Sequence, residues 1–390
     1  MSKYFEFDTK AKVLSGERAL SRVPYELSIR GKERPFVMSD KGLWGLGVTK
    51  SAIKSMKLEN YTLFTDIPVD SSTETVNNAT IAYKANNCDC VIAIGGGSVI
   101  DTAKGVILSI VSGQSDIEKI EGADAIKKEN SSLFIAVPTT AGTGSEMTSV
   151  AVIKSAIKAS KLEYISTFIL PDISVIDPSM TVSLPKKTTA STAIDALTHC
   201  IEAYTCLMKN PISDAYAICA IKLIIGNLFK AIENGKDEEA RWNLANAAML
   251  AGAAFSNSMV GAVHSIGHAL GAVCHVAHGD AMAILLPSVL KLNLEKCDSL
   301  YGELLCFVNE ERFIKTSVQY RGKAFIEEIE KLLSMLHEQT ELPVRLSQTG
   351  KVEEANFEEI ALKAMADGSN IVNPVALNNE RILKVLKEAF

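Results

Sequence analysis

Histidine is concentrated in one part of this 390-residue chain, and the spacing suits metal chemistry. Five of the six histidines fall within the 80 residues from 199 to 278. Asp195 and His199 are four residues apart in AIDALTHCIEAY, and His264 and His268 repeat that spacing in GAVHSIGHALGAV. Residues four apart project from one face of a helix, so each pair can reach a common ion.

A third element is needed to complete such a group. His278 lies 14 residues beyond His264, where Gly279 predicts a turn. The surrounding segments are apolar, and unpaired polar groups buried there are costly, so a divalent cation gives these side chains a reason to converge. One carboxylate with imidazoles and no thiolate suits Fe²⁺ as well as Zn²⁺. Five imidazoles exceed what a site with an open position uses, so some must act as neighbouring groups or proton carriers.

Three consecutive glycines and a serine, Gly95, Gly96, Gly97 and Ser98, follow the apolar run CVIAI and precede a helical pattern. Glycines let the backbone approach a ligand closely, and a helix start presents unpaired N–H groups to a phosphate. A tight turn alone would also use glycine, although three in a row cost much backbone entropy. Asp101 is expected to support the start of the helix from its first turn.

A second polar loop and one acidic residue follow other predicted strands. Thr139, Thr140 and Thr143 come after SLFIAV, and Asp40 ends RPFVMS. The carboxyl ends of parallel strands share one edge, where open sheets bind ligands, so the two loops together predict a dinucleotide-sized site. A carboxylate at position 40 accepts hydrogen bonds from a ribose 2′-hydroxyl and repels a 2′-phosphate. Capping of the next helix is the alternative role of Asp40.

The elements that carry these residues change character along the chain. Short apolar runs alternate with helical segments up to about residue 185, at 34–40, 61–67, 89–95, 132–140 and 173–178. This alternation predicts an α/β domain with a mostly parallel sheet. Helical periodicity dominates afterwards, over 187–207, 213–235, 237–257, 259–273, 323–340 and 353–366. We therefore expect a dinucleotide-binding domain at 1–184 and a helical metal-binding domain at 185–390.

Composition excludes several kinds of partner. The net charge of −6 and the absence of a Lys/Arg run argue against nucleic acid and anionic membranes. We expect no apolar stretch long enough for a membrane span. Eight scattered cysteines and a charged N-terminus predict a cytoplasmic protein with reduced thiols, and Cys88-Asp89-Cys90 is expected to enter a core strand rather than bind a metal.

These motifs together resemble the iron-containing (group III) alcohol dehydrogenase family. The resemblance covers essentially the whole chain and rests on five segments in family order: GGGSVIDTAK (95–104), PTTAGTGSE (138–146), IDPSMTVSLP (176–185), DALTHCIEAY (195–204) and VHSIGHALGAVCHVAHG (263–279). It implies an N-terminal α/β dinucleotide domain, a helical C-terminal domain, and hydride transfer between NAD(H) and a small alcohol or aldehyde at Fe²⁺ or Zn²⁺. It also implies a homo-oligomer, a dimer or larger.

The resemblance assigns roles residue by residue. The metal ligands would be Asp195, His199, His264 and His278. His268 would relay a proton or orient substrate. The cofactor would contact Gly96, Gly97 and Ser98 through its pyrophosphate, Thr139, Thr140 and Thr143 around the ribose and nicotinamide, Asp40 as the residue that selects NAD, and Lys161.

Some features depart from the family pattern, and other activities stay open. Ala193-Ile194 stand where the family usually has a glycine before its Asp-Ala-Leu-Thr-His motif, and His275 is left without a role. A glycerol dehydrogenase-like polyol oxidoreductase is one alternative. A dehydroquinate synthase-like lyase is another, although residues 255–280 contain no Arg or Lys for a phosphorylated substrate. A non-catalytic metal- or nucleotide-binding protein is the third.

Overall fold

The computed structural model describes residues 4–120, 132–155, 157 and 160–390. Contacts divide the chain into two units. The first is an α/β unit, Asp8–Ser183, and the second is a helical unit, Leu184–Phe390 together with Met1–Phe7. The N-terminal residues up to Phe7 thus group with the C-terminal part of the chain rather than with the sheet that follows them.

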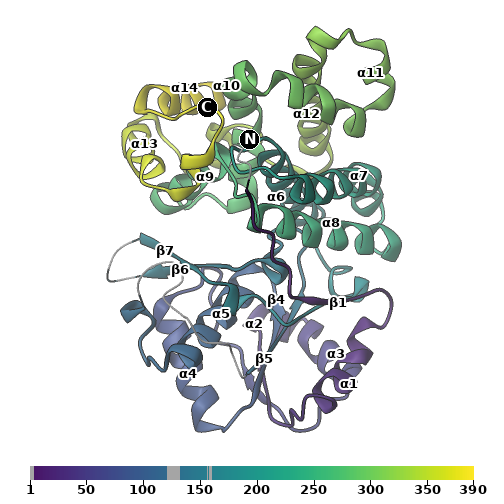
Figure 1. Ribbon diagram of the computed structural model, residues 1–390, viewed down its shortest axis with the longest axis vertical. Coiled ribbons are helices and arrows are strands. Elements are labelled where there is room, and N and C mark those ends of the chain that lie inside the picture. Colours follow the sequence, from purple (N-terminus) through teal and green to yellow (C-terminus); the bar gives the residue numbers. More distant parts are fainter. Residues whose placement is uncertain (1–3, 121–131, 156, 158–159) are drawn as a thin grey trace. The chain divides into compact units, whose positions relative to one another are not determined.

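A six-stranded sheet forms the centre of the α/β unit (Figure 1), in the order β1-β8-β5-β4-β2-β3 with every pair parallel. Its strands are β1 (Lys12–Ser15), β2 (Pro35–Met38), β3 (Thr62–Phe64), β4 (Cys90–Gly95), β5 (Leu133–Pro138) and β8 (Ile173–Ile176). The predicted α/β class with a parallel sheet is confirmed. Cys90 is fully buried within β4, as expected for a core strand.

Three strands lie outside the predicted set. The edge strand β1 is short and mostly exposed, so its sequence KVLS has no buried apolar run to detect. An antiparallel pair, β6 (Val150–Ser155) and β7 (Ser160–Ile165), is separate from the main sheet. Strand β6 alternates in burial instead of being buried on both faces, so it lacks the pattern typical of a central parallel strand.

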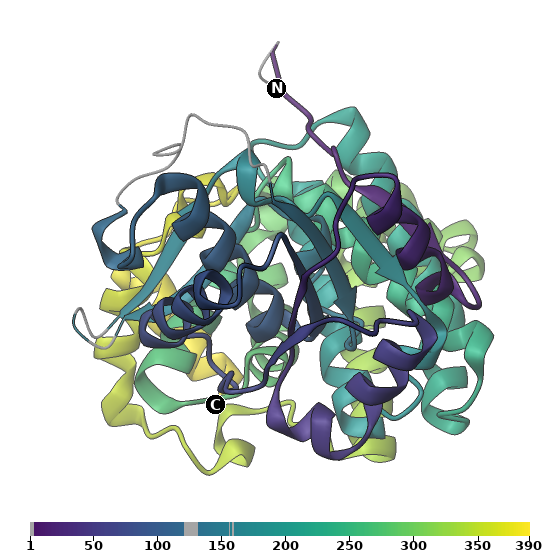
Figure 2. The same ribbon diagram turned by 90° about the horizontal axis from the view of Figure 1, so that it is seen from below.

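Side chains of the sheet alternate between two hydrophobic layers. Val91 and Ala93 of β4 face one layer, whereas Ile92 and Ile94 face the other, as the two-residue period of a strand requires. Helices α4 (Thr73–Ala85) and α5 (Gly97–Ser112) cover the first face, and α1 (Val23–Ser28) and α3 (Val48–Ser55) cover the second (Figures 1 and 2). The remaining short helix, α2 (Lys41–Gly45), follows β2 directly.

The helical unit contains nine α-helices among the described residues. They are α6 (Lys186–Thr205), α7 (Pro211–Glu233), α8 (Glu238–Ser256), α9 (Ala262–Cys274), α10 (His278–Val308), α11 (Glu310–Lys315), α12 (Arg321–Thr340), α13 (Phe357–Met365) and α14 (Asn379–Ala389). Helix α6 packs against α7, α8 and α10, while α9 packs against α10 and α13. The helices that carry Asp195 and the histidines are therefore neighbours.

The long helix α10 differs from the sequence expectation of a turn at Gly279. His278 is its first residue, and Gly279 lies within its first turn. A Cβ atom at Gly279 would come 2.7 Å from the carbonyl oxygen of Ser191 in α6. The glycine is thus needed for close contact between α10 and α6, and a turn assignment from composition alone was wrong.

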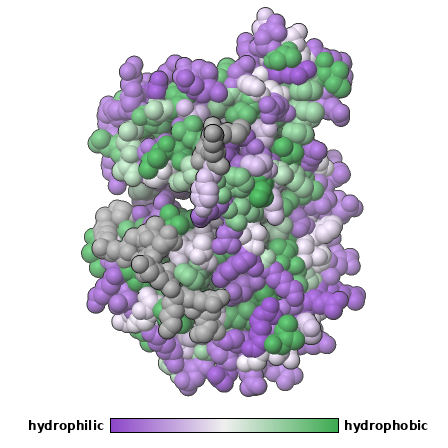
Figure 3. Space-filling view, in the orientation of Figure 1, coloured by the Kyte–Doolittle hydropathy of each residue, from purple (hydrophilic) through white to green (hydrophobic). Residues whose placement is uncertain are grey.

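Helix α7 also differs from expectation, because it is long and apolar enough to cross a membrane by length and composition. Its 18-residue window has a mean hydropathy of 1.6, and 39% of that window is buried within the protein. The core helix of a soluble protein passes the same test. On the face of the molecule drawn in Figure 3, hydrophilic and hydrophobic residues are interspersed.

Candidate metal centre and cofactor site

Helix α6 carries three acidic or imidazole side chains along one face. Asp195, His199 and Glu202 follow one another at spacings of four and three residues, and all three are buried. Helix α9 brings His264 and His268 on its own face, and His278 begins α10. The predicted helical pairs are therefore formed, and the packing of α6, α9 and α10 brings them together.

Three imidazoles converge on one oxygen of Asp195. Its Oδ1 lies 3.8 Å from His199 Nε2, 3.6 Å from His264 Nε2 and 3.2 Å from His278 Nε2. Ligands about 2.1 Å from a tetrahedral cation are roughly 3.4 Å from one another. The three distances to Asp195 Oδ1 are close to that value. Asp195, His199 and His264 also form a group whose ligand atoms all lie within 4.8 Å of one another, while His278 joins it through Asp195. The His278 side chain is 36% exposed and the others at most 5%, so the cluster has one accessible side.

Unsatisfied polar atoms support the same conclusion. Asp195 Oδ1 and His264 Nε2 are buried and have no hydrogen-bond partner among the described residues. Orphaned buried polar atoms are costly and need a partner such as an ion. These donors, one carboxylate oxygen and three imidazole nitrogens, fit divalent iron or zinc.

The electrostatics of the cluster also call for positive charge. Burial alone raises the pKa of Asp195, but His199, His278 and His264 outweigh it and hold that pKa well below its usual range. Burial lowers the pKa of His199 to about 3, so this imidazole is neutral and has a lone pair to offer. Around His264, burial is outweighed by Glu202 and Asp195, which raise its pKa to about 9.

Glu202 is a functional residue that sequence reasoning missed. Its Oε2 lies 2.5 Å from His264 Nδ1, and its Oε1 accepts a hydrogen bond from the backbone N–H of Val263 at 2.7 Å. A carboxylate on the far nitrogen of a metal-binding imidazole fixes the tautomer and makes the ligand more basic. Its position seven residues after Asp195, on the same helix face, was the available signal.

Asp367 is the second missed residue. Its Oδ2 lies 2.8 Å from His268 Nδ1, and its Oδ1 accepts from the backbone N–H of Ser369. Burial raises the pKa of Asp367, but the hydrogen bond and charge of His268 outweigh it and lower the pKa. Asp367 is 99 residues from His268 in sequence, so no local spacing links the two.

Two further side chains near the cluster have defined places. Phe255 stacks on the His199 ring, with the ring centroids 4.2 Å apart, and so shields one face of this imidazole. His275 is exposed and ends α9 in the left-handed conformation, with φ of 54°. Its carbonyl oxygen accepts from Lys351. His275 therefore serves as a helix end in this structure.

Apart from Lys161, the predicted cofactor residues follow the carboxyl ends of strands of the main sheet. Strand β2 pairs with β4, and Met38 lies beside Ala93, so Asp40 and Gly96 follow the same ends of adjacent strands. Strand β3 pairs with β2 on one side of these two strands, and β5 pairs with β4 on the other side. Such a reversal of strand order is where open α/β sheets bind ligands.

The glycine turn and the threonine loop are in contact at this edge. Helix α5 begins at Gly97 with Gly96 as its N-cap, so a helix does follow the glycines. A Cβ atom at Gly97 would lie 2.9 Å from the methyl carbon of Thr143, and one at Gly96 would lie 3.3 Å from Thr140. The backbone of the helix start therefore lies directly against the threonine side chains. The first N–H groups of a helix have no partner within the helix and can bind an anionic ligand.

The other predicted cofactor residues are placed as follows. Asp40 caps α2, since its Oδ1 accepts from the backbone N–H of Leu43 at 2.8 Å. Its capping role is confirmed, and a cofactor role stays a prediction.

Ser98 lies in the first turn of α5, where its hydroxyl donates to the carbonyl of Val69. Thr139 is buried, and its N–H donates to the Gly95 carbonyl. Lys161 lies in β7, and its Nζ is 3.6 Å from Asp70 Oδ1.

Asp101 does not support the start of α5 as expected. It is the fifth residue of the helix, beyond the first turn. Its Oδ1 accepts from Ser145 Oγ at 2.6 Å, and its Oδ2 accepts from the backbone N–H of Val152 at 3.0 Å. The carboxylate thus links α5 to the segment after the threonine loop.

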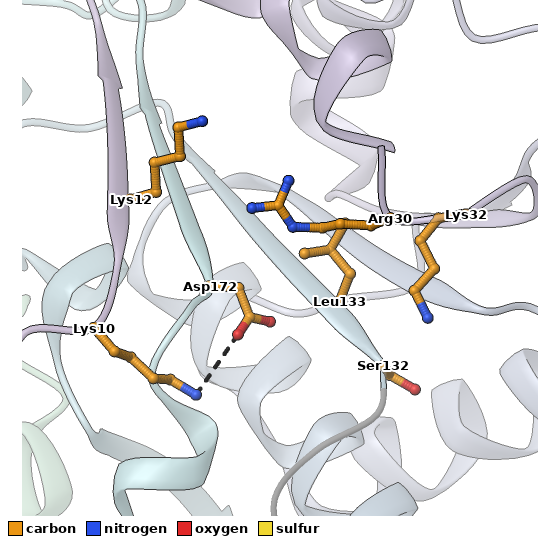
Figure 4. A pocket seen from close by; sticks show the side chains of 7 residues that line it. All are labelled: Lys10, Lys12, Arg30, Lys32, Ser132, Leu133 and Asp172. Atoms are coloured by element: carbon orange, nitrogen blue, oxygen red, sulfur yellow. Dashed lines mark ion pairs between the residues drawn. The ribbon is translucent and has the colours of Figure 1, made fainter. Parts of the chain in front are cut away.

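An open hollow of about 510 Å³ lies at the opposite, amino-terminal edge of the sheet (Figure 4). It is lined by Lys10, Lys12, Arg30, Lys32, Ser132, Leu133 and Asp172. The basic side chains are held by acidic ones, with Lys10 3.6 Å from Asp172 and Lys12 and Arg30 both bound to the buried Glu26. None of the predicted site residues line this hollow.

The role of Glu202 predicts a metal-affinity defect. Glu202→Gln should weaken binding of Fe²⁺ and Zn²⁺ about 10- to 100-fold, because His264 loses the charge that orients it. Equilibrium dialysis under anaerobic conditions measures this. His275→Asn is the matched control, since it changes an exposed histidine and Asn tolerates the left-handed conformation. Wild-type affinity in Glu202→Gln would contradict the assignment.

Comparison with known proteins places this geometry in a family. The model of the iron-containing alcohol dehydrogenase family matches residues 10–178, and the model of the C-terminal part of the Fe-containing alcohol dehydrogenase family matches residues 189–390. Both predicted motif groups, the glycine and threonine loops and the histidine-rich helices, lie within these matched ranges.

Individual relatives agree with the family models. The chain is 33% identical over 379 residues to alcohol dehydrogenase 4 of Saccharomyces cerevisiae, with 96% of each chain covered. It is 31% identical over 377 residues to the NAD-dependent methanol dehydrogenase of Bacillus methanolicus, covering 96% of this chain and 97% of the relative. A solved structure of 1,3-propanediol oxidoreductase matches with a TM-score of 0.94, 29% identity and 100% of both chains covered. The chain therefore belongs to the iron-containing alcohol dehydrogenase family and is an enzyme of that oxidoreductase class.

Proposed function

We propose that this enzyme interconverts a small alcohol and its aldehyde with NAD(H), using iron held by Asp195, His199, His264 and His278. The convergence of three imidazoles on one buried carboxylate oxygen carries the proposal, because one carboxylate and three imidazoles supply the donor types and the negative charge that a divalent cation needs. When bound, iron supplies Lewis-acid polarisation of the substrate oxygen. Zn²⁺ fits the same donors and is the alternative metal.

The cofactor residues act by binding and orientation. The N–H groups at the start of α5 would hold the pyrophosphate, with Gly96, Gly97 and Ser98 giving close access. Thr139, Thr140 and Thr143 would line the ribose and nicotinamide side, and Lys161 would lie near the cofactor. Asp40 would accept from the adenosine ribose, using the carboxylate that also caps α2. When bound, NAD would supply the hydride acceptor that alcohol oxidation requires.

His268 is the proposed proton carrier. Alcohol oxidation releases one proton from the hydroxyl group in addition to the hydride. The Nδ1 atom of His268 is engaged by Asp367, which leaves Nε2 to accept that proton and to return it in the reductive direction. The side chain is 20% exposed, so it can pass the proton to water.

The substrate class and surroundings follow from the family. The proposed partners are short primary alcohols or diols and their aldehydes, with no nucleic acid and no membrane surface, consistent with a net charge of −6. We also propose a homo-oligomer, a dimer or larger, and a cytoplasmic location. Eight cysteines free of disulfides are compatible with that compartment.

Removal of one metal ligand tests the proposed function. His264→Ala should lose bound iron and reduce turnover by about 1000-fold or more. Its NADH affinity should stay within about twofold of wild type, because the proposed cofactor residues lie in the α/β unit. Anaerobic NADH oxidation with short aldehydes, with metal-free protein and added Fe²⁺ or Zn²⁺, measures turnover. Full activity with unchanged metal content would overturn the ligand assignment.

The Asp367–His268 pair predicts a second defect. Asp367→Asn should lower kcat about 10- to 100-fold, because an amide no longer holds the required imidazole tautomer. Metal content and NADH affinity should stay at wild-type levels, which separates this defect from that of His264→Ala. An unchanged kcat would remove His268 from the proton path.

The position of Asp40 predicts a change in cofactor preference. Asp40→Gly should shift the ratio of kcat/KM for NADH over NADPH toward NADPH by about tenfold, since the carboxylate that repels a 2′-phosphate is gone. Asp237→Gly is the matched control, because Asp237 caps α8 through the N–H of Ala240 in the same way. An unchanged ratio in Asp40→Gly would leave Asp40 with its capping role alone.

A further inference from the structure

Lys104 is a fully buried cation for which the proposed reaction has no direct use. It lies on α5 with an exposed fraction of 0%. Burying a charge is costly unless it is paired and hydrogen-bonded. Its Nζ donates to Ser145 Oγ at 2.8 Å, to Thr148 Oγ1 at 2.7 Å and to the carbonyl of Val150 at 2.7 Å. All three protons of the ammonium group therefore have acceptors.

The acceptors all belong to the segment that follows the threonine loop. Ser145 begins the short helix Ser145–Met147, and Val150 begins β6. Asp101, one turn before Lys104 on α5, binds the same segment through Ser145 Oγ and the N–H of Val152. Ser145 is shared, since its hydroxyl accepts from Lys104 and donates to Asp101.

Two acidic side chains act on the Lys104 cation. Asp101 Oδ1 lies 3.8 Å from Nζ, and the buried Glu146 is the other acid that acts on it. Burial lowers the pKa of Lys104 to about 8 although Asp101 and Glu146 oppose this, so the side chain is still a cation at neutral pH. Burial raises the pKa of Glu146 to about 7. Loss of the cation would leave these acids without their partner.

The hydrogen bonds of Lys104, Asp101 and Ser145 lie close to the start of α5, where the pyrophosphate is proposed to bind. Helix α5 starts at Gly97, whose missing Cβ is what lets the helix start lie against Thr143. Asp101 and Lys104 are one and two turns further along the same helix and bind the chain just beyond that loop. The glycine turn and the threonine loop are thus linked twice. Gly97 lies against Thr143 at the start of α5, and the buried Lys104 and Asp101 bind the chain beyond the loop.

We propose that Lys104, together with Asp101 and Ser145, is a positioning residue for NAD(H), which holds the start of α5 and the threonine loop at the separation that one cofactor molecule must span. This inference rests on the proposed function, because it needs the cofactor at these two segments. Groups that hold a ligand gain affinity when a supporting layer fixes them in advance.

Lys104→Met tests the proposal in the full-length protein. NADH fluorescence titration should give a Kd raised about tenfold, and KM for NADH should rise in parallel while kcat at saturating NADH stays within about threefold. The Kd of ADP should change less than about threefold, because ADP needs the start of α5 but not the threonine loop. A lower unfolding temperature alone would not produce this difference between the changes in Kd for NADH and for ADP.

Tyr83→Phe is the matched control for general destabilisation. Tyr83 is buried in the same unit and shares a hydrogen bond of 3.0 Å with Ser132, near the amino-terminal edge of the sheet. It should lower the unfolding temperature and leave the Kd of NADH unchanged. Ser145→Ala removes only the shared hydroxyl, so it provides the test if Lys104→Met does not fold, with an expected rise in Kd of about three- to tenfold.

The outcomes separate this inference from the proposed function. Gly97→Ala should weaken NADH binding by crowding Thr143 at the start of α5 itself. If Gly97→Ala weakens binding while Lys104→Met and Ser145→Ala keep the wild-type Kd, the positioning role is overturned and the proposed cofactor site stands. If none of the three changes the Kd of NADH, the cofactor site is wrong and the positioning role is overturned with it.

Discussion

The helical unit depends on a buried carboxylate that needs positive charge. Asp195 lies in the middle of a 20-residue helix and is flanked in sequence by Ala193, Ile194, Ala196 and Leu197, all of them buried. An isolated carboxylate there would favour unfolding, so the site persists only if imidazoles and a cation compensate it. Glu202 adds a second negative group behind His264, which increases the demand for a cation. The close approach of α6 and α10 at Gly279 can be understood as a consequence of bringing His278 to this carboxylate.

In the α/β unit the corresponding constraint is the contact between two loops. In the proposed cofactor site, the start of α5 and the threonine loop lie close enough to bind one ligand, and side chains on both would normally keep them apart. Because Gly96 and Gly97 have no side chains, the start of α5 can lie against Thr140 and Thr143. Lys104 and Asp101 supply attraction further along α5, where the Lys104 side chain is fully buried and its charge is poorly screened. The two units therefore use the same means, a buried ion network, to hold backbone segments in place.

Much of this organisation could be predicted from the sequence, because its signals are local. The spacing of Asp195 with His199 and of His264 with His268 follows from helix geometry, and the buried strands were apolar runs bounded by polar residues. Contacts between distant segments were not predictable in this way. Asp367 pairs with a histidine 99 residues away, and Gly279 appeared to be a turn residue because nothing in its own segment reveals Ser191. Asp101 looked like a helix-start residue for the same reason.

The chain enters and leaves the α/β unit near residues 7 and 184, since its first residues group with the helices. Phe7 packs against Tyr216 of α7, with the ring centroids 5.5 Å apart. The α/β unit is thus inserted into the helical one, and two covalent connections join them. A single proteolytic cut at either crossing would leave the units attached. Exchanging the nucleotide-binding unit between relatives would require two matched junctions, and a simple fusion of an N-terminal half to a C-terminal half would separate Phe7 from its packing partner.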